Sequence, residues 1–172
     1  MDKKAKEILA VVVLVFALVA LALTGMYSGT PIDKYPPQTD DETQIIALLI
    51  DFNKAKTNHD LEPYLACLTN GGSFMFGGSI MVSKQDLKQR LPMFWANRES
   101  GYILTRPSSR EELNGNFFAG ILYDPVITIN HDGAKAVVTF VTPIIRWRTK
   151  LFLDFQKQNG VWLISRFEWD MG

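Results

Sequence analysis

One stretch of the chain constrains its fold more than any other, a run of 25 residues without a charge from Ile8 to Ile32. Its first part, Ile8 to Leu23, consists only of Ala, Val, Leu, Ile and Phe. As an α-helix, Ile8 to Met26 would be about 28 Å long, which is close to the thickness of the hydrocarbon core of a bilayer. We therefore expect residues 8–26 to form a transmembrane helix that anchors the chain in the cell membrane.

The charges on either side of this run predict its orientation. Residues 1–7 contain three lysines, whereas Asp33, Asp40, Asp41 and Glu42 follow the run. Lysines gather on the cytoplasmic side of membrane spans. We therefore expect residues 1–7 to be a short cytoplasmic tail and the rest of the chain to be extracytoplasmic.

A cleaved signal peptide is the alternative interpretation of the same run. Ala20-Leu21-Ala22 offers the small-x-small pattern of a cleavage site, and cleavage near Ala22 would release a secreted or periplasmic domain. The apolar run is longer than the core of about 7–15 residues in an ordinary signal peptide, which favours the uncleaved anchor.

The composition excludes several classes of function. Eighteen basic residues balance eighteen acidic ones, so the chain lacks the basic excess of a nucleic-acid binder. One cysteine, Cys67, excludes an intramolecular disulfide and a multi-cysteine metal site. The two histidines, His59 and His131, have no flanking ligands at metal spacing, and no phosphate-binding or dinucleotide motif is present. We expect neither a metal nor a cofactor.

The residues after the span divide into a linker and one domain. Residues 27–38 contain three prolines and are expected to form an extended linker. Residues 39–172 are expected to form one exported domain. Thr39 to Glu42 fits a capping box, and apolar residues at helical spacing follow it, which predicts a helix that ends near Thr57.

Two further helices and a short hairpin are expected before the middle of the domain. Asp60 can cap a second helix, which Asn70-Gly71-Gly72 would end. Short strands are expected over residues 73–76 and 79–82, on either side of a glycine pair. Ser83 can cap a third helix through about Arg90, with Pro92 limiting or kinking it.

From Ile121 onward the apolar pattern has a period of two, which predicts strands over residues 121–130, 134–148, 150–158 and 161–170. Asn159-Gly160 indicates a two-residue hairpin turn. That turn would place Phe155 opposite Ile164, Asp154 opposite Ser165 and Phe152 opposite Phe167. Both faces of the sheet would then be partly apolar, so the second face would meet a pocket, a second subunit or another partner.

This order of elements resembles the nuclear transport factor 2-like superfamily, which includes ketosteroid isomerase and the SnoaL-like cyclases. The resemblance is carried by the segments Phe52–Leu61, Leu65–Leu68, Ser73–Phe76, Ser83–Leu87, Gly133–Val138 and Asn159–Ile164. It implies an α+β fold in which a cone-shaped, curved antiparallel sheet packs against three N-terminal helices. It also implies a homodimer formed through the sheet.

The resemblance also locates the chemistry of the superfamily in the mouth of the cone. The catalytic carboxylate of the isomerase branch corresponds to Phe76 or Gly77, and its tyrosine corresponds to Phe52. Neither phenylalanine nor glycine has a side chain that can accept a proton or donate to an oxyanion. We therefore expect no catalytic residues, and a binding or assembly module tethered to the membrane rather than an enzyme.

Aromatic side chains are the candidates for a ligand pocket inside the cone. The expected lining of such an apolar pocket is Phe52, Tyr64, Phe74, Phe76, Trp95 and Trp147. Arg146 and Arg148 form a basic cluster that could contact an anion or, alternatively, pair with Glu168 or Asp170. The expected partners are the membrane, a second copy of the chain, and a small apolar ligand or an envelope protein.

An enzyme is the alternative hypothesis. The fold would suit an isomerase, cyclase or hydratase that acts on a small hydrophobic substrate. Its candidate polar groups are Asp51, His59 and Tyr64.

Overall fold

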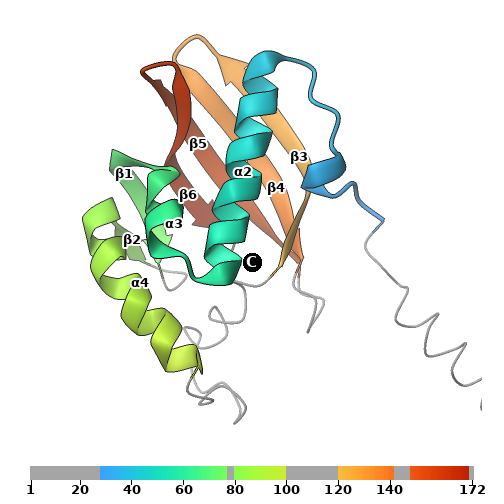
Figure 1. Cartoon of the computed structure of the whole chain (residues 1–172). Helices are drawn as coiled ribbons and strands as arrows, with labels where there is room; N and C mark the ends of the chain where they lie inside the picture. Colours follow the sequence, from blue (N-terminus) through green and yellow to red (C-terminus); the bar gives the residue numbers. More distant parts are fainter. Residues whose placement is uncertain (1–27, 77–79, 100–119, 142–147, 171–172) are drawn as a thin grey trace, which may run out of the picture.

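A six-stranded sheet organises the residues that the computed structural model describes, which are 28–76, 80–99, 120–141 and 148–170. The strand order is β2-β1-β6-β5-β4-β3. The strands are β1 (Leu68–Phe76), β2 (Ile80–Val82), β3 (Ile121–Asn130), β4 (Gly133–Val141), β5 (Arg148–Gln158) and β6 (Val161–Trp169). Figure 1 shows the sheet curving around the long helix α2 (Asp40–Asn58), which crosses one of its faces.

One pair of strands corrects the prediction of an antiparallel sheet. Neighbouring strands are antiparallel except β1 and β6, which run parallel. β1 enters the sheet from the helical layer and not from a hairpin with β6, so no tight turn forces the two strands to run in opposite directions. The fold remains α+β, with a mixed sheet.

Thr39 begins α2 as predicted, because its side-chain oxygen accepts a hydrogen bond of 3.1 Å from the backbone N–H of Glu42. A short 3-10 helix, η1 (Ile32–Lys34), precedes it, and α3 (Leu61–Ala66) follows it. All three α-helices contact the sheet, and Figure 1 shows α3 and α4 beside the β1–β2 end of it.

The third predicted helix is longer than expected. α4 (Lys84–Glu99) continues past Pro92 instead of ending near Arg90. Leu87 and Leu91 before the proline and Trp95 after it are all buried. Their packing holds the helix on both sides of the proline, which outweighs the loss of one backbone hydrogen bond.

The glycines after α3 lie within a strand and do not end a helix as predicted. Gly71 and Gly72 belong to β1. A Cβ at Gly72 would lie 2.2 Å from the ring of Phe74 and 2.7 Å from the carbonyl oxygen of Ser165 on β6. The glycine therefore allows β1 to approach β6 closely.

The β5–β6 hairpin has the predicted register only near its turn. Phe155 pairs with Ile164 as expected, but Asp154 pairs with Arg166 and Phe152 with Glu168. The register shifts after Phe155 because β6 carries one extra residue, a β-bulge. The shift turns Phe167 into the buried core, so the opposite face of the sheet is less apolar than predicted.

The predicted linker is partly docked on the domain. Pro31 forms an isolated bridge with Tyr123 of β3, and Ile32 is buried. The predicted membrane span, residues 8–26, and the tail before it lie outside the described residues. Within the ranges that the structure does describe, no helix is long and apolar enough to cross a membrane.

Candidate functional site

The structure gathers four of the predicted pocket residues into one aromatic group. The ring centroids of Phe52 and Tyr64 are 4.9 Å apart, and those of Tyr64 and Trp95 are 6.1 Å apart. Phe167 joins Phe52 to Phe74, at 5.6 and 5.4 Å. All of these residues are buried.

The other predicted site residues lie elsewhere. Phe76 packs against Phe94 of α4, with ring centroids 5.3 Å apart. Arg148 begins β5 as an exposed residue, and Glu168 pairs with Arg166 at 2.7 Å. Arg146 and Trp147 lie outside the described residues.

Two of the three polar groups of the enzyme hypothesis meet at one tryptophan. His59, in a left-handed backbone conformation at the end of α2, stacks on Trp95 at 5.2 Å. Tyr64 meets the same ring edge-on, and burial raises the pKa of its hydroxyl. Asp51 lies on the exposed side of α2, so the structure does not bring the three together.

A residue that the sequence analysis missed is the most unusual in the described part of the chain. Lys56 on α2 is only 1% exposed. Its Nζ lies 4.0 Å from the ring centroid of Phe140 on β4 and 5.4 Å from that of Trp169 on β6. No hydrogen-bond partner reaches this nitrogen among the described residues. The two rings, themselves 5.1 Å apart, offer this nitrogen the negative faces of their π systems.

Burial changes the protonation of this lysine. Removal from water lowers the pKa of Lys56 from 10.5 to about 7. Near neutral pH the side chain therefore exists both as an ammonium, which donates hydrogen bonds, and as a neutral amine, which can also accept one. Either form can bind a group that the fold does not itself provide.

A second unpartnered polar atom lies one helical turn before Lys56. Asn53 donates from Nδ2 to the carbonyl oxygen of Gly120 at 3.0 Å, whereas its Oδ1 is buried without a partner. Positions 53 and 56 share one face of a helix. We call Asn53, Lys56, Gly120, Phe140 and Trp169 the Lys56 site. It combines an unused donor and an unused acceptor with two aromatic rings.

Gly120 is needed for the close packing of this site. A Cβ at position 120 would lie 2.4 Å from the ring of Phe140 and 2.7 Å from the carbonyl oxygen of Val141. Thr69 Oγ1 and Trp95 Nε1 are also buried without a partner. Of these two atoms, Trp95 Nε1 belongs to the aromatic group described above.

The sequence did contain a signal for Lys56. Ile45, Leu49 and Phe52 are the buried stripe of α2, and position 56 continues that stripe at helical spacing. A lysine at a position where the pattern requires an apolar residue marks a buried charge. Phe140 and Trp169 carry no comparable signal, because only the fold brings their strands to α2.

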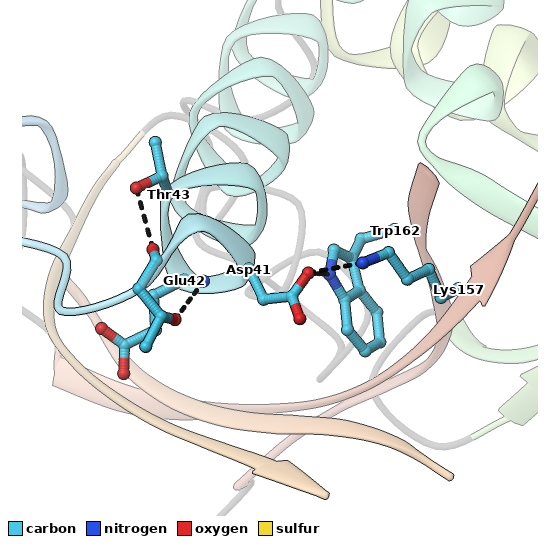
Figure 2. A network of polar contacts seen from close by, with 6 residues as sticks. Asp41, Glu42, Thr43, Lys157 and Trp162 are labelled. Carbon is cyan, nitrogen blue, oxygen red and sulfur yellow. Dashed lines mark hydrogen bonds and ion pairs between the residues drawn. The ribbon is translucent and has the colours of Figure 1, made fainter. Parts of the chain in front are cut away.

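At the opposite end of α2, a charged side chain has polar partners from two strands. Asp41 accepts hydrogen bonds at Oδ1 from Lys157 Nζ at 2.6 Å and from Trp162 Nε1 at 2.8 Å (Figure 2). The bond from Lys157, followed by that from Trp162, lowers the pKa of the Asp41 carboxyl. These contacts fix the first turn of α2 to the β5–β6 hairpin.

No cluster of three metal-binding side chains occurs in the ranges that the structure describes. Cys67 is buried, and burial raises the pKa of its thiol to about 11. A thiol that holds its proton at neutral pH is a poor nucleophile. The unusual chemistry of the described residues is therefore concentrated at Lys56.

Comparison with solved structures identifies the fold. A protein of unknown function with a cystatin-like fold from Nostoc punctiforme superposes with a TM-score of 0.54 at 19% identity, over 80% of this chain and 97% of that one. A nuclear transport factor 2-like protein from Cytophaga hutchinsonii superposes with a TM-score of 0.53 at 14% identity, over 77% of this chain and 98% of that one. An NTF2-like protein with a cystatin-like fold from Novosphingobium aromaticivorans gives 0.54 at 12% identity, over 77% and 84%.

These neighbours confirm the fold that the sequence resemblance predicted. The chain has the nuclear transport factor 2-like, cystatin-like fold. Identities this low show the fold alone, and function must be argued from the site. No protein-family model and no curated protein matches the sequence.

Proposed function

We propose that this chain is a membrane-tethered binding module on the extracytoplasmic side, which holds a small apolar ligand in the Lys56 site. The observation that carries the proposal is Lys56 itself, a lysine removed from water with no partner among the described residues. Such a group destabilises the fold by several kcal/mol. A buried polar group without a partner in the fold is best explained by a ligand that supplies one.

The chemistry of the site narrows the class of ligand. Phe140 and Trp169 would contact an apolar body, and Lys56 would donate to a carboxylate or carbonyl oxygen. Asn53 Oδ1 would accept from a hydroxyl or N–H of the same molecule. The ligand we propose is a small apolar compound with one such polar end.

The tether rests on the uncharged run before the domain, for which residues 8–26 have the length of a span. We also propose a homodimer through the part of the open sheet face that β4, β5 and β6 form, which leaves the edge strand β3 outside the interface. A hollow of about 190 Å³ on that face is lined by exposed Phe152 and by Lys135, Asp154, Arg166 and Glu168. Two basic and two acidic side chains around an apolar centre can complement themselves across a two-fold axis.

Native mass spectrometry of the whole chain, released from nanodiscs, tests the proposed ligand. We expect the wild type to carry an extra mass of a few hundred daltons, and the variant Lys56→Met to lose it. Lys54→Met is the matched control, because Lys54 is exposed two residues away on the same helix. Retention of the adduct by Lys56→Met, or its loss from Lys54→Met, would contradict the proposed site.

The enzyme hypothesis keeps one observation in its favour. A lysine with a pKa of about 7 has the value that suits a general base at neutral pH. An isomerase, cyclase or hydratase built on this site would use Lys56, and not Asp51, His59 and Tyr64, which the structure does not bring together. Turnover that rises with pH through 7 and disappears in Lys56→Met would establish this alternative.

A further inference from the structure

Two backbone hydrogen-bonding groups of Thr30 are fixed to one residue of β3. The N–H of Thr30 donates to Asp124 Oδ1 at 2.7 Å, and the N–H of Asp124 donates to the carbonyl oxygen of Thr30 at 2.9 Å. Pro31 bridges to Tyr123 next to them. We call these contacts the Thr30 clamp. They hold the start of the described chain against the edge strand of the sheet.

The backbone of β3 is specially shaped at this clamp. Asp124 has a φ of 46°, in the left-handed region that is costly for a residue with a side chain. The register of β3 against β4 shifts between Tyr123 and Val126, which marks a bulge. The bulge directs both the N–H and the carboxylate of Asp124 toward Thr30. The Thr30 clamp therefore depends on the bulge in β3.

The clamp limits how far the domain can stand from the membrane. Three residues, 27 to 29, separate the end of the proposed span at Met26 from Thr30. Four fully extended residue steps reach about 14 Å at most. The headgroup layer on one side of a bilayer is roughly 5–8 Å thick. Thr30, and the edge of β3 with it, must then lie at the membrane surface.

Two apolar side chains of this edge strand point outward from the sheet face that α2 leaves open. Val126 is 66% exposed and Ile121 is 48% exposed, and both belong to β3. When exposed aliphatic side chains within reach of a bilayer enter its interface, they leave water and the free energy of the system falls.

We propose that the β3 edge is a lipid-facing surface, on which Val126 and Ile121 contact the outer leaflet of the membrane that holds residues 8–26. This inference rests on the tether of the proposed function. It also relates the Lys56 site to the membrane, because Gly120 of that site directly precedes Ile121. An apolar ligand dissolved in the bilayer would then lie next to the site that binds it.

Fluorescence quenching by lipids tests the surface in the whole chain, reconstituted in nanodiscs of phosphatidylcholine with a nitroxide on the headgroup. A bimane label is placed on Val126→Cys. The matched control is Val161→Cys, which is 59% exposed in the wild type. Across the sheet, Val126 on β3 is in line with Glu168 on β6, three strands away. Val161 lies seven residues before Glu168 on β6, so it is far from Val126 in both directions. That separation is roughly 25 Å in a pleated sheet. Cys67 is buried, and labelled wild type gives the background.

We expect at least twofold more quenching at position 126 than at position 161. Ten glycine and serine residues inserted between Ser28 and Gly29 should reduce quenching at 126 to the control level, because the domain can then leave the surface. Equal quenching at 126 and 161 would overturn the inference.

A carbonate wash of the same protein in vesicles separates the two ways to fail. If the chain is released, the tether is wrong and the lipid-facing surface falls with it. If the chain stays in the membrane and position 126 is not preferentially quenched, the tether stands and only the lipid-facing surface is overturned.

Discussion

The two ends of α2 differ in whether a charged side chain has a polar partner. At the first turn, Asp41 is paired with both Lys157 and Trp162, and the side chains of the ion pair remain 35% and 40% exposed. Near the last turn, Lys56 is 1% exposed and has aromatic rings where a counter-ion would be expected. One helix therefore carries a satisfied charge at one end and an unsatisfied charge at the other.

The difference distinguishes structural polar groups from functional ones. The Asp41 network uses its polar atoms to position the helix, and water shares the solvation of its charges. The Lys56 site leaves an ammonium and an amide oxygen unused in a place that water does not reach. A fold tolerates such a cost where the group serves something other than stability.

The largest expected effect comes from removal of the unsatisfied charge. The pKa of Lys56 is about 7 in the folded chain against 10.5 in the unfolded chain. Below pH 7 Lys56 is charged in both states, so the whole free-energy cost of burying its ammonium group destabilises the folded chain. At pH 7, Lys56→Met should raise the free energy of unfolding by roughly 4 kcal/mol in urea titrations followed by tryptophan fluorescence.

The same variant should remove a pH dependence. Between pH 7 and 8 the folded chain loses its remaining proton at Lys56, and between pH 8 and 9 the unfolded chain binds about one proton more there than the folded chain does. Wild-type stability should therefore rise with pH, by about 1.4 kcal/mol per pH unit between pH 8 and 9. Lys56→Met should not show this rise, and exposed Lys54→Met should show it unchanged. The window ends at pH 9 because the thiol of Cys67, with a raised pKa, begins to act in the opposite direction there. A parallel pH profile for wild type and Lys56→Met would show that the lysine is not buried.

A smaller effect, this time a loss of stability, is expected when a side chain is introduced into the packed Lys56 site. Gly120→Ala introduces a Cβ against the ring of Phe140 and the backbone of β4, so we expect a loss of about 1–3 kcal/mol of stability. Gly71→Ala is the control, because a Cβ at Gly71 has no atom within 4 Å. Thermal unfolding of both variants gives the comparison, and equal melting temperatures would contradict the packing of the site.

The smallest effect is expected at the satisfied end. Asp41→Ala removes the partner of Lys157 and Trp162, whereas Asp40→Ala removes an equal charge one residue earlier in the first turn of the same helix. Only Asp41→Ala should lower the urea midpoint and shift the tryptophan emission. The pKa of Asp41 is lowered in the fold, so its contribution is present above pH 3.8 and is lost as the pH falls through the folded value. Identical midpoints for the two variants would show that the network does not hold the helix.

The parts of the fold that the sequence predicted correctly depend on interactions between residues close together in the chain. Thr39 begins α2 and Asn159-Gly160 turns the β5–β6 hairpin because a capping hydroxyl and a turn dipeptide act within a few residues. The bulge in β6 and the course of α4 through Pro92 could not be predicted in the same way. Both depend on packing against other elements, which a local pattern does not contain.

The residues of the candidate site also differ in whether a local sequence pattern could predict them. Phe52 and Tyr64 were predicted to lie close together, because helical spacing places both on the apolar sides of their helices. Trp95 was predicted to join them only as an aromatic residue, because the third helix was expected to end near Arg90. Lys56 was missed because a lysine in a helix is usually solvated. Its burial follows from its position on the apolar stripe, and its contacts follow from two strands whose pairing only the fold determines.

The protonation of Lys56 tests the central claim most directly. Nuclear magnetic resonance of the whole chain in detergent micelles, with lysines labelled at Cε, measures the pKa of each lysine. We predict one lysine resonance that titrates near pH 7 and is absent from Lys56→Met. The chain is first freed of its ligand by denaturation and refolding, because a bound carboxylate would itself raise the pKa of Lys56. If every lysine of the ligand-free chain titrates near pH 10.5, Lys56 is solvated or paired within the fold, and the binding site proposed around it does not exist.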